Sequence, residues 1–172
     1  MSDLYIGMIS GTSVDGVDAV LAELDQATCV LLAAATTPYP PDLHRRIHDL
    51  IATPTTSLRE LGGIDHAVGE FFAECARSII GAANVGPERI AAIGHHGQTI
   101  FHQPTGHEPF SMQIGDPNVV AAMTGITTVA DFRRLDMAHG GQGAPLVPAF
   151  HAWRFSSPSE RRVVLNVGGI AN

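Results

Sequence analysis

The residues with the clearest chemistry form a turn near the N-terminus, Gly11-Thr-Ser-Val-Asp-Gly-Val-Asp18, with apolar runs on both sides. Thr12 and Ser13 carry hydroxyl groups, and the glycines allow positive φ and a close approach of the backbone to a ligand. The carboxylates of Asp15 and Asp18 can hold a hydrated Mg²⁺. Such a set favours a phosphate site, although the same residue types also form ordinary solvated hairpin turns.

Five elements in the first half of the chain would position this turn. The alternating apolar pattern predicts hairpin strands over residues 4–10 and 17–24, and a third strand over 28–37. A short helix is expected from Asp42, as its cap, to Ile51. A longer amphipathic helix is expected from the capping box at Ser57 to Ala83, with apolar residues at helical spacing.

The second half is expected to alternate short strands with helices. The predicted strands cover residues 90–94, 100–103, 126–130 and 162–167. The predicted helices run from Pro117 to Thr124, with Asp116 as cap and Gly125 as stop, and from Pro145 to Phe155. A second Gly turn, Gly168-Gly-Ile-Ala-Asn172, follows the last strand. That strand would keep an open edge, which predicts a second half beyond it.

Composition narrows the class of protein. The chain has 172 residues, 45% of them hydrophobic, which is about one compact domain. A net charge of −7 argues against a binder of nucleic acid or of anionic membranes. Cys29 and Cys75 lie in apolar patterns and are expected to be buried thiols. No stretch is long enough to span a membrane and the N-terminus has no basic signal-peptide start, so we expect a cytoplasmic protein.

Six segments resemble the anhydro-N-acetylmuramic acid kinase family. They occur in the family's order and span the chain, which makes chance agreement very improbable. The segments are Met8–Asp18, Gly94–Thr99, Gln113–Asp116, Gly125–Arg134, Gly140–Phe150 and Leu165–Asn172.

The resemblance implies an α/β fold, the first lobe of a two-lobed sugar-kinase/actin/heat-shock-chaperone ATPase of ribonuclease H-like type. A mixed sheet flanked by helices is expected. Residues 1–160 would form the first lobe, and residues 161–172 would begin an otherwise missing second lobe. ATP would lie between the lobes, and each lobe would contribute a phosphate loop. The residues implied for ATP and phosphate are Gly11, Thr12, Ser13, Val14, Asp15, Gly16, Val17, Asp18, Gly168 and Gly169.

The resemblance also implies a reaction. Family members use ATP and Mg²⁺ to open 1,6-anhydro-N-acetylmuramic acid with water and to phosphorylate O6, giving N-acetylmuramic acid 6-phosphate in peptidoglycan recycling. Asp15 or Asp18 would hold the Mg²⁺ through water. The water-activating carboxylate is expected beyond Asn172, so the chain alone is expected to be inactive. A homodimer is expected for the full-length family. The alternative is a non-catalytic sugar-binding or partner-requiring lobe.

Candidate sugar contacts follow two predicted strands. His96 and Gln98 could hydrogen-bond sugar hydroxyls or the N-acetyl group, since open α/β sheets usually bind ligands at strand ends. Arg133 and Arg134 could bind the lactyl carboxylate or a phosphate, because an arginine fork matches such groups, and Asp131 could orient that arginine or a sugar hydroxyl. The alternatives are a hydrogen-bonded loop histidine at the first position and a structural ion pair at the second.

Two further sequence patterns are a Gly-rich loop and a group of histidines. The loop Gly140-Gly-Gln-Gly143 fits either a cleft lid or plain turn chemistry. The histidines at 95, 96, 102 and 107 do not follow a standard zinc-ligand spacing, so a zinc site is not expected.

Overall fold

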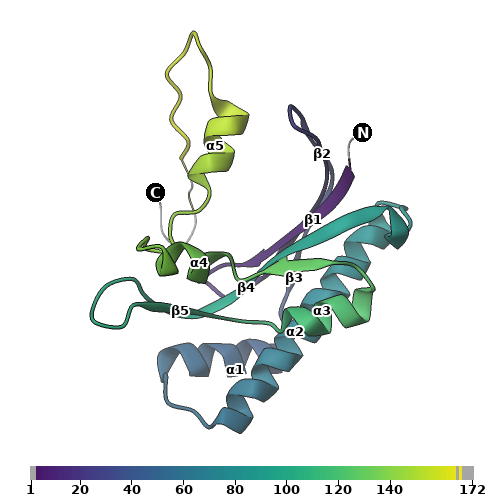
Figure 1. Cartoon of the computed structure of the whole chain (residues 1–172). Coiled ribbons are helices and arrows are strands. Elements are labelled where there is room, and N and C mark those ends of the chain that lie inside the picture. The colour runs from purple at the N-terminus through teal and green to yellow at the C-terminus, as the bar shows by residue number, and fades with distance from the viewer. Residues whose placement is uncertain (1–2, 166, 168–172) are drawn as a thin grey trace.

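A mixed sheet of six strands forms the centre of the fold (Figure 1). The structure, a computed structural model, describes residues 3–165 and 167. The strand order is β3-β2-β1-β4-β5, and β6 also pairs with β4. The strands are β1 (Asp3–Ser10), β2 (Gly16–Leu24), β3 (Cys29–Pro38), β4 (Ile90–Gln103), β5 (Phe110–Ile114) and β6 (Thr128–Ala130). The predicted mixed α/β architecture is confirmed.

Strand directions bring the ends of two strands to the middle of a third. β1, β2 and β3 pair antiparallel as a meander, whereas β1 pairs parallel with β4, and β4 parallel with β6. β5 returns antiparallel along β4. β1 ends opposite Gln98 and β6 ends opposite His95, so the segments that follow these two strands can meet beside the middle of β4.

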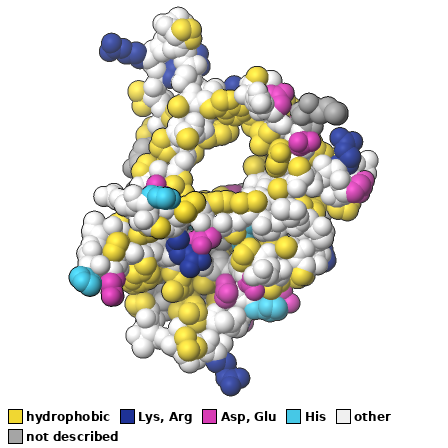
Figure 2. Space-filling view, viewed as in Figure 1, with side chains coloured by type: hydrophobic (Ala, Val, Ile, Leu, Met, Phe, Trp, Pro, Cys, Tyr) yellow, Lys and Arg dark blue, Asp and Glu magenta, His cyan; other side chains and the backbone are white. Residues whose placement is uncertain are grey.

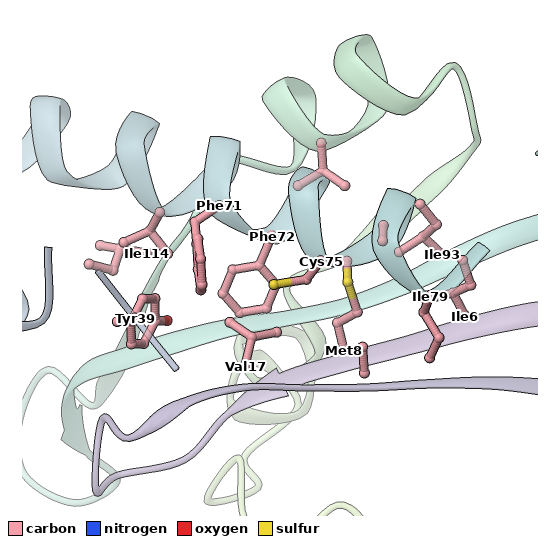
Figure 3. Close-up of a cluster of buried hydrophobic side chains, with 14 of the residues drawn as sticks. Ile6, Met8, Val17, Tyr39, Phe71, Phe72, Cys75, Ile79, Ile93 and Ile114 are labelled. Atoms are coloured by element: carbon pink, nitrogen blue, oxygen red, sulfur yellow. The ribbon is translucent and has the colours of Figure 1, made fainter. Parts of the chain in front are cut away.

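Helices cover one face of this sheet. Helices α1 (Pro41–Ala52), α2 (Leu58–Ala82) and α3 (Pro117–Thr124) lie together on that face (Figure 1). The apolar stripe of α2 meets the inward residues of β1 and β2, as Phe72, Met8 and Val17 show in Figure 3. No helix in the described part of the chain is long and apolar enough to span a membrane.

Helix ends follow the capping rules for α2 and α3. The Ser57 hydroxyl accepts the Glu60 amide at 3.1 Å, while the Glu60 carboxylate accepts the Arg46 Nε–H instead of closing the box. Asp116 caps α3 by accepting the Asn118 amide, and Gly125 ends it with φ of 72°. Only a residue that tolerates left-handed backbone fits there without strain.

Two expected helix boundaries are wrong, and one helix was not expected. α1 begins at Pro41 with Pro40 at the N-cap, so Asp42 lies in the first turn, where its carboxylate pairs with Arg45. α5 (Pro148–Phe155) begins three residues later than expected, because Pro145 lies in the preceding loop. Residues 132–138 form a helix, α4 (Phe132–Ala138), that the apolar pattern did not reveal.

The other differences concern the last strand and one cysteine. Residues 162–165 form no strand, since no strand of the described chain pairs with them, and backbone groups of a strand need such a partner. The predicted strands 90–94 and 100–103 are one strand, β4. Cys75 is buried as expected, but Cys29 is only partly buried because β3 is an edge strand.

Gly16 marks a position where the sheet leaves no room for a side chain. A Cβ at Gly16 would lie 2.3 Å from the Thr37 carbonyl oxygen on β3. We expect Gly16→Ala to lower the free energy of unfolding by about 1–3 kcal/mol, the usual cost of overpacking. Urea unfolding followed by circular dichroism measures this change.

Gly62→Ala is the matched control. Gly62 lies within α2, and a Cβ there would meet no atom within 4 Å. This substitution should raise the free energy of unfolding by up to about 1 kcal/mol, because alanine favours the helix. Equal effects of the two substitutions would contradict the close packing at Gly16.

Candidate functional site

The hairpin tip between β1 and β2 is a tight turn with an exposed outer side. The Gly11 carbonyl accepts the Val14 amide at 3.2 Å, and Thr12 and Ser13 are exposed between them. Val14 adopts φ of 59°, a conformation disfavoured for a β-branched residue, and its side chain is buried. Gly11 and Gly16 do not use the positive φ that glycine allows: Val14 adopts it instead, and burial of its side chain holds the strained residue.

The other residues of the predicted phosphate loop lie in different environments. Gly16 packs against β3, and the Val17 side chain is fully buried in the core. Asp15 is exposed beside the tip, whereas the Asp18 carboxylate accepts the Thr36 hydroxyl at 2.6 Å. Thr12, Ser13 and Asp15 therefore form the accessible part of the loop. Gly168 and Gly169, the predicted second loop, lie outside the described residues.

Strand β4 changes register beside the turn. Met8 pairs with His95 and Ser10 with Gln98, so two steps along β1 match three along β4. The bulge includes Gly97, whose φ is 73° and where a Cβ would lie 2.5 Å from the Ile114 carbonyl oxygen. Because of this bulge, the side chains of His95 and Gln98 are both buried.

Gln98 lies inside the protein, next to the turn. Its Oε1 accepts the Ser10 hydroxyl at 2.5 Å. Its Nε2 donates to the carbonyl oxygens of Gly11 and Thr99, at 3.2 and 3.0 Å. The side chain has 0% exposure, so it joins β4 to the turn and does not line an open surface.

His96 belongs to a network that crosses to α4 and the Gly-rich loop. Its Nδ1 lies 3.0 Å from the Gly97 carbonyl oxygen, and its Nε2 accepts the Arg133 Nε–H at 2.8 Å. Arginine only donates, so the His96 proton must be on Nδ1. Arg133 also donates to the Gly143 carbonyl at 2.5 Å. Burial, and then the charge of Arg133, lower the pKa of His96 and keep it neutral.

Asp131 and Arg134 form a bidentate pair at the start of α4. Oδ1 of Asp131 lies 2.7 Å from Nε of Arg134, and Oδ2 lies 2.5 Å from Nη2. The hydrogen bond that Arg134 donates to Asp131, and the charge of that carboxylate, raise the pKa of Arg134. The pair is the ion pair foreseen as the alternative, and it also faces a cavity.

That cavity has a volume of about 260 Å³ and lies between the middle of β4, β5 and the start of α4. Its polar wall includes His96, Gln113, Asp131 and Arg134, and Phe110 contributes to its apolar wall. On the face seen in Figure 2, basic and acidic side chains adjoin one another among apolar side chains. A mixed lining of this kind suits a small polar ligand with an apolar side.

Two contacts beside the site, made by His95 and Asp136, could not be predicted from the sequence pattern. His95 is buried, places its ring edge-on to Phe72 at 4.3 Å between centroids, and its Nε2 lies 2.6 Å from the Gly115 carbonyl oxygen. Asp136 on α4 accepts the Gly143 amide at 2.7 Å, and so shares the Gly-rich loop with Arg133. The loop predicted as lid or turn is thus held at Gly143 from two sides.

The buried histidines make stability depend on pH. Burial lowers the pKa of His95 and of His96 below the ordinary value of 6.5, so below that value the unfolded chain binds more protons. The stabilising contribution is complete above pH 6.5 and is lost as the pH falls through the folded-state pKa values. Each histidine costs at most about 1.4 kcal/mol per pH unit.

We expect the free energy of unfolding in urea to be lower at about pH 5.5 than at about pH 7.5. The double variant His95→Gln, His96→Gln should show a flatter dependence, because glutamine does not titrate. An equally steep dependence in this variant would assign the effect to other groups. Exposed His66→Gln, paired with Glu70 on α2, is the control that leaves both buried histidines in place.

Comparison with known proteins places this site in a family. The family model for anhydro-N-acetylmuramic acid kinase matches residues 3–172. An anhydro-N-acetylmuramic acid kinase of Pasteurella multocida is 53% identical over 168 residues, covering 98% of this chain and 45% of the relative. One of Vibrio vulnificus is 51% identical over 170 residues, covering 99% and 46%.

One of Aliivibrio fischeri is 51% identical over 168 residues, covering 98% of this chain and 46% of the relative. The chain thus spans about half the length of the curated relatives it matches. The family has the sugar-kinase/actin/heat-shock-chaperone type of fold, in agreement with the mixed sheet and its helices. The chain belongs to the anhydro-N-acetylmuramic acid kinase family.

Proposed function

We propose that this chain supplies the phosphate-binding and sugar-binding half of an ATP-dependent kinase. The kinase would open 1,6-anhydro-N-acetylmuramic acid with water and phosphorylate O6, giving N-acetylmuramic acid 6-phosphate for peptidoglycan recycling. One observation carries the proposal: β1 and β6, the parallel neighbours of β4, end on either side of its bulge, where Ser10 pairs with Gln98 and Ala130 with His95. The turn at Thr12 follows the end of β1, the pair at Asp131 follows the end of β6, and His96 lies between them on β4.

The hairpin tip is the proposed phosphate site. Thr12 and Ser13 offer exposed hydroxyl and amide donors, which suit the oxygens of a transferred phosphoryl group. A Mg²⁺ ion would neutralise the charge that develops on those oxygens. Asp15 fits such an ion better than Asp18, whose carboxylate already accepts the Thr36 hydroxyl. Magnesium commonly uses one or two carboxylates, water and phosphate as ligands, so one exposed aspartate at the tip is a sufficient protein share.

The cavity beside α4 is the proposed sugar site. Asp131 accepts two of the five guanidinium N–H groups of Arg134, which leaves the others for a ligand. Arg133, held by neutral acceptors, supplies positive charge for the lactyl carboxylate. His96, with its proton fixed on Nδ1, would orient Arg133 or contact a sugar hydroxyl. These roles use the chemistry of a small, polar, anionic sugar.

The rest of the catalytic centre is proposed to lie in the second lobe. Relatives are about twice as long as this chain, and we place the boundary between lobes near residue 160. Apolar side chains in residues 146–165 are exposed in a way unusual for a monomer, among them Phe150, Trp153 and Val163. The second lobe would cover them and supply the water-activating carboxylate. The homodimer and the cytoplasmic location belong to the same proposal.

The test is a coupled assay of ADP release with 1,6-anhydro-N-acetylmuramic acid, ATP and Mg²⁺. We expect no sugar-dependent turnover from the chain alone. We expect turnover when a polypeptide matching the second half of the Pasteurella multocida relative is added, at a typical kinase rate of about 1–100 s⁻¹. Turnover by the chain alone would contradict the proposal that the second lobe supplies the water-activating carboxylate. Sugar binding without turnover in the mixture would favour the non-catalytic lobe.

Arg133→Met tests the sugar site in that mixture. Loss of the guanidinium should lower kcat/KM for the sugar by about 100-fold, since charge-assisted hydrogen bonds contribute about 1.5–3 kcal/mol each. Arg89→Met is the matched control, because Arg89 precedes β4 at the end of the strand opposite the site. Equal losses in both variants would remove Arg133 from the sugar site.

A further inference from the structure

A buried amide ties the proposed phosphate turn to the neighbouring strand. Gln98 comes from β4, 87 residues after Gly11, and its side chain is fully buried where β1 ends. It hydrogen-bonds the Ser10 hydroxyl and the Gly11 carbonyl, the last groups of the chain before the exposed tip. A buried polar side chain with this many partners restricts the backbone it contacts.

The orientation of this amide follows from its partners. The carbonyl oxygens of Gly11 and Thr99 can only accept, so the NH₂ group of Gln98 must face both of them. Its Oε1 then faces the Ser10 hydroxyl, which donates. The Gly11 carbonyl accepts a second hydrogen bond, from the Val14 amide across the turn. Both lone pairs of that oxygen are therefore directed into the protein.

This arrangement fixes a peptide plane. The Gly11–Thr12 peptide is planar and trans, so its N–H points opposite to its carbonyl. With the Gly11 carbonyl turned toward Gln98 and Val14, the Thr12 N–H points away from the core, on the exposed side of the tip. Gly11 alone would allow many orientations, because glycine restricts its backbone little.

We propose that Gln98 is a positioning residue for phosphate transfer, which locks the Gly11–Thr12 peptide so that the Thr12 N–H faces the phosphate. The inference rests on the proposed phosphate site at the tip. Gln98 does not touch the phosphate: it acts through the Gly11 carbonyl. Val14, with its strained φ of 59°, is part of the same arrangement, because its amide donates to the Gly11 carbonyl that also accepts from Gln98.

The substitution Gln98→Met removes the amide and keeps the length of the side chain. The probe is Mg-tripolyphosphate, which needs only the phosphate turn and not an adenine site. Titration of the ¹⁵N-labelled chain, followed through the amide signals of Thr12 and Ser13, gives the dissociation constant. Hydrogen exchange at the Val14 amide, which bonds the Gly11 carbonyl, reports the turn itself.

Gln98→Met should raise the dissociation constant about fivefold or more and speed Val14 exchange by at least a similar factor, as expected for loss of a hydrogen bond. Ser10→Ala removes only the bond to Oε1 and should produce a smaller change in the same direction. Thr124→Val is the control: it removes two hydrogen bonds at the end of α3, far from the turn in the fold, and should alter neither reading.

The outcomes separate the inference from the proposed function. If Gln98→Met speeds Val14 exchange but leaves the dissociation constant unchanged, or changes neither, the inference is overturned. Should Gln98→Met fail to fold, Ser10→Ala decides by the same two readings. If the wild-type chain binds no tripolyphosphate, the proposed phosphate site is overturned and the role of Gln98 in phosphate transfer falls with it. Val14 exchange then shows whether Gln98 still holds the turn.

Discussion

The parallel pairing of β1 with β4 is the constraint on which the rest of the site depends. It joins residues about 90 positions apart and sets Ser10 opposite Gln98. With β6 parallel on the other side of β4, the ends of β1 and β6 flank the middle of β4, at His95 to Gln98. A shift of this pairing by one residue would exchange the buried and accessible sides of β4. The proposed phosphate turn and the cavity would then both lose their contacts with β4.

The bulge at Gly97 explains why neighbouring histidines have different roles. In a regular strand, side chains alternate between faces, so His96 and Gln98 would share a side. The extra residue returns Gln98 to the buried side, together with His95, and leaves His96 beside the cavity. One glycine, in a conformation that other residues rarely adopt, thus separates the buried amide of Gln98 from His96, which contacts Arg133.

Local chemistry made much of the fold predictable. The hairpin, the capped start of α2 and the whole of α3 follow from periodicity and from caps at Ser57 and Asp116, which act within a few residues. The burial of Gln98 could not be foreseen, because it depends on a bulge and on a strand far away in the sequence. The short helix α4 could not be predicted, because Asp131 at its start adopts a left-handed conformation and its side chain does not cap the helix.

Charge in the candidate site is arranged unevenly, and the arrangement favours an anionic ligand. Asp131 compensates Arg134 directly, whereas the described partners of Arg133 are a neutral imidazole and a backbone carbonyl. Partial burial lowers the pKa of Arg133, and among the described residues no carboxylate forms an ion pair with its guanidinium. In a chain with net charge −7, this guanidinium keeps a local positive field that a carboxylate or phosphate would neutralise. Protonation of His96 at Nε2 would remove the acceptor of the Arg133 Nε–H and place a second positive charge beside Arg133, which would weaken this contact.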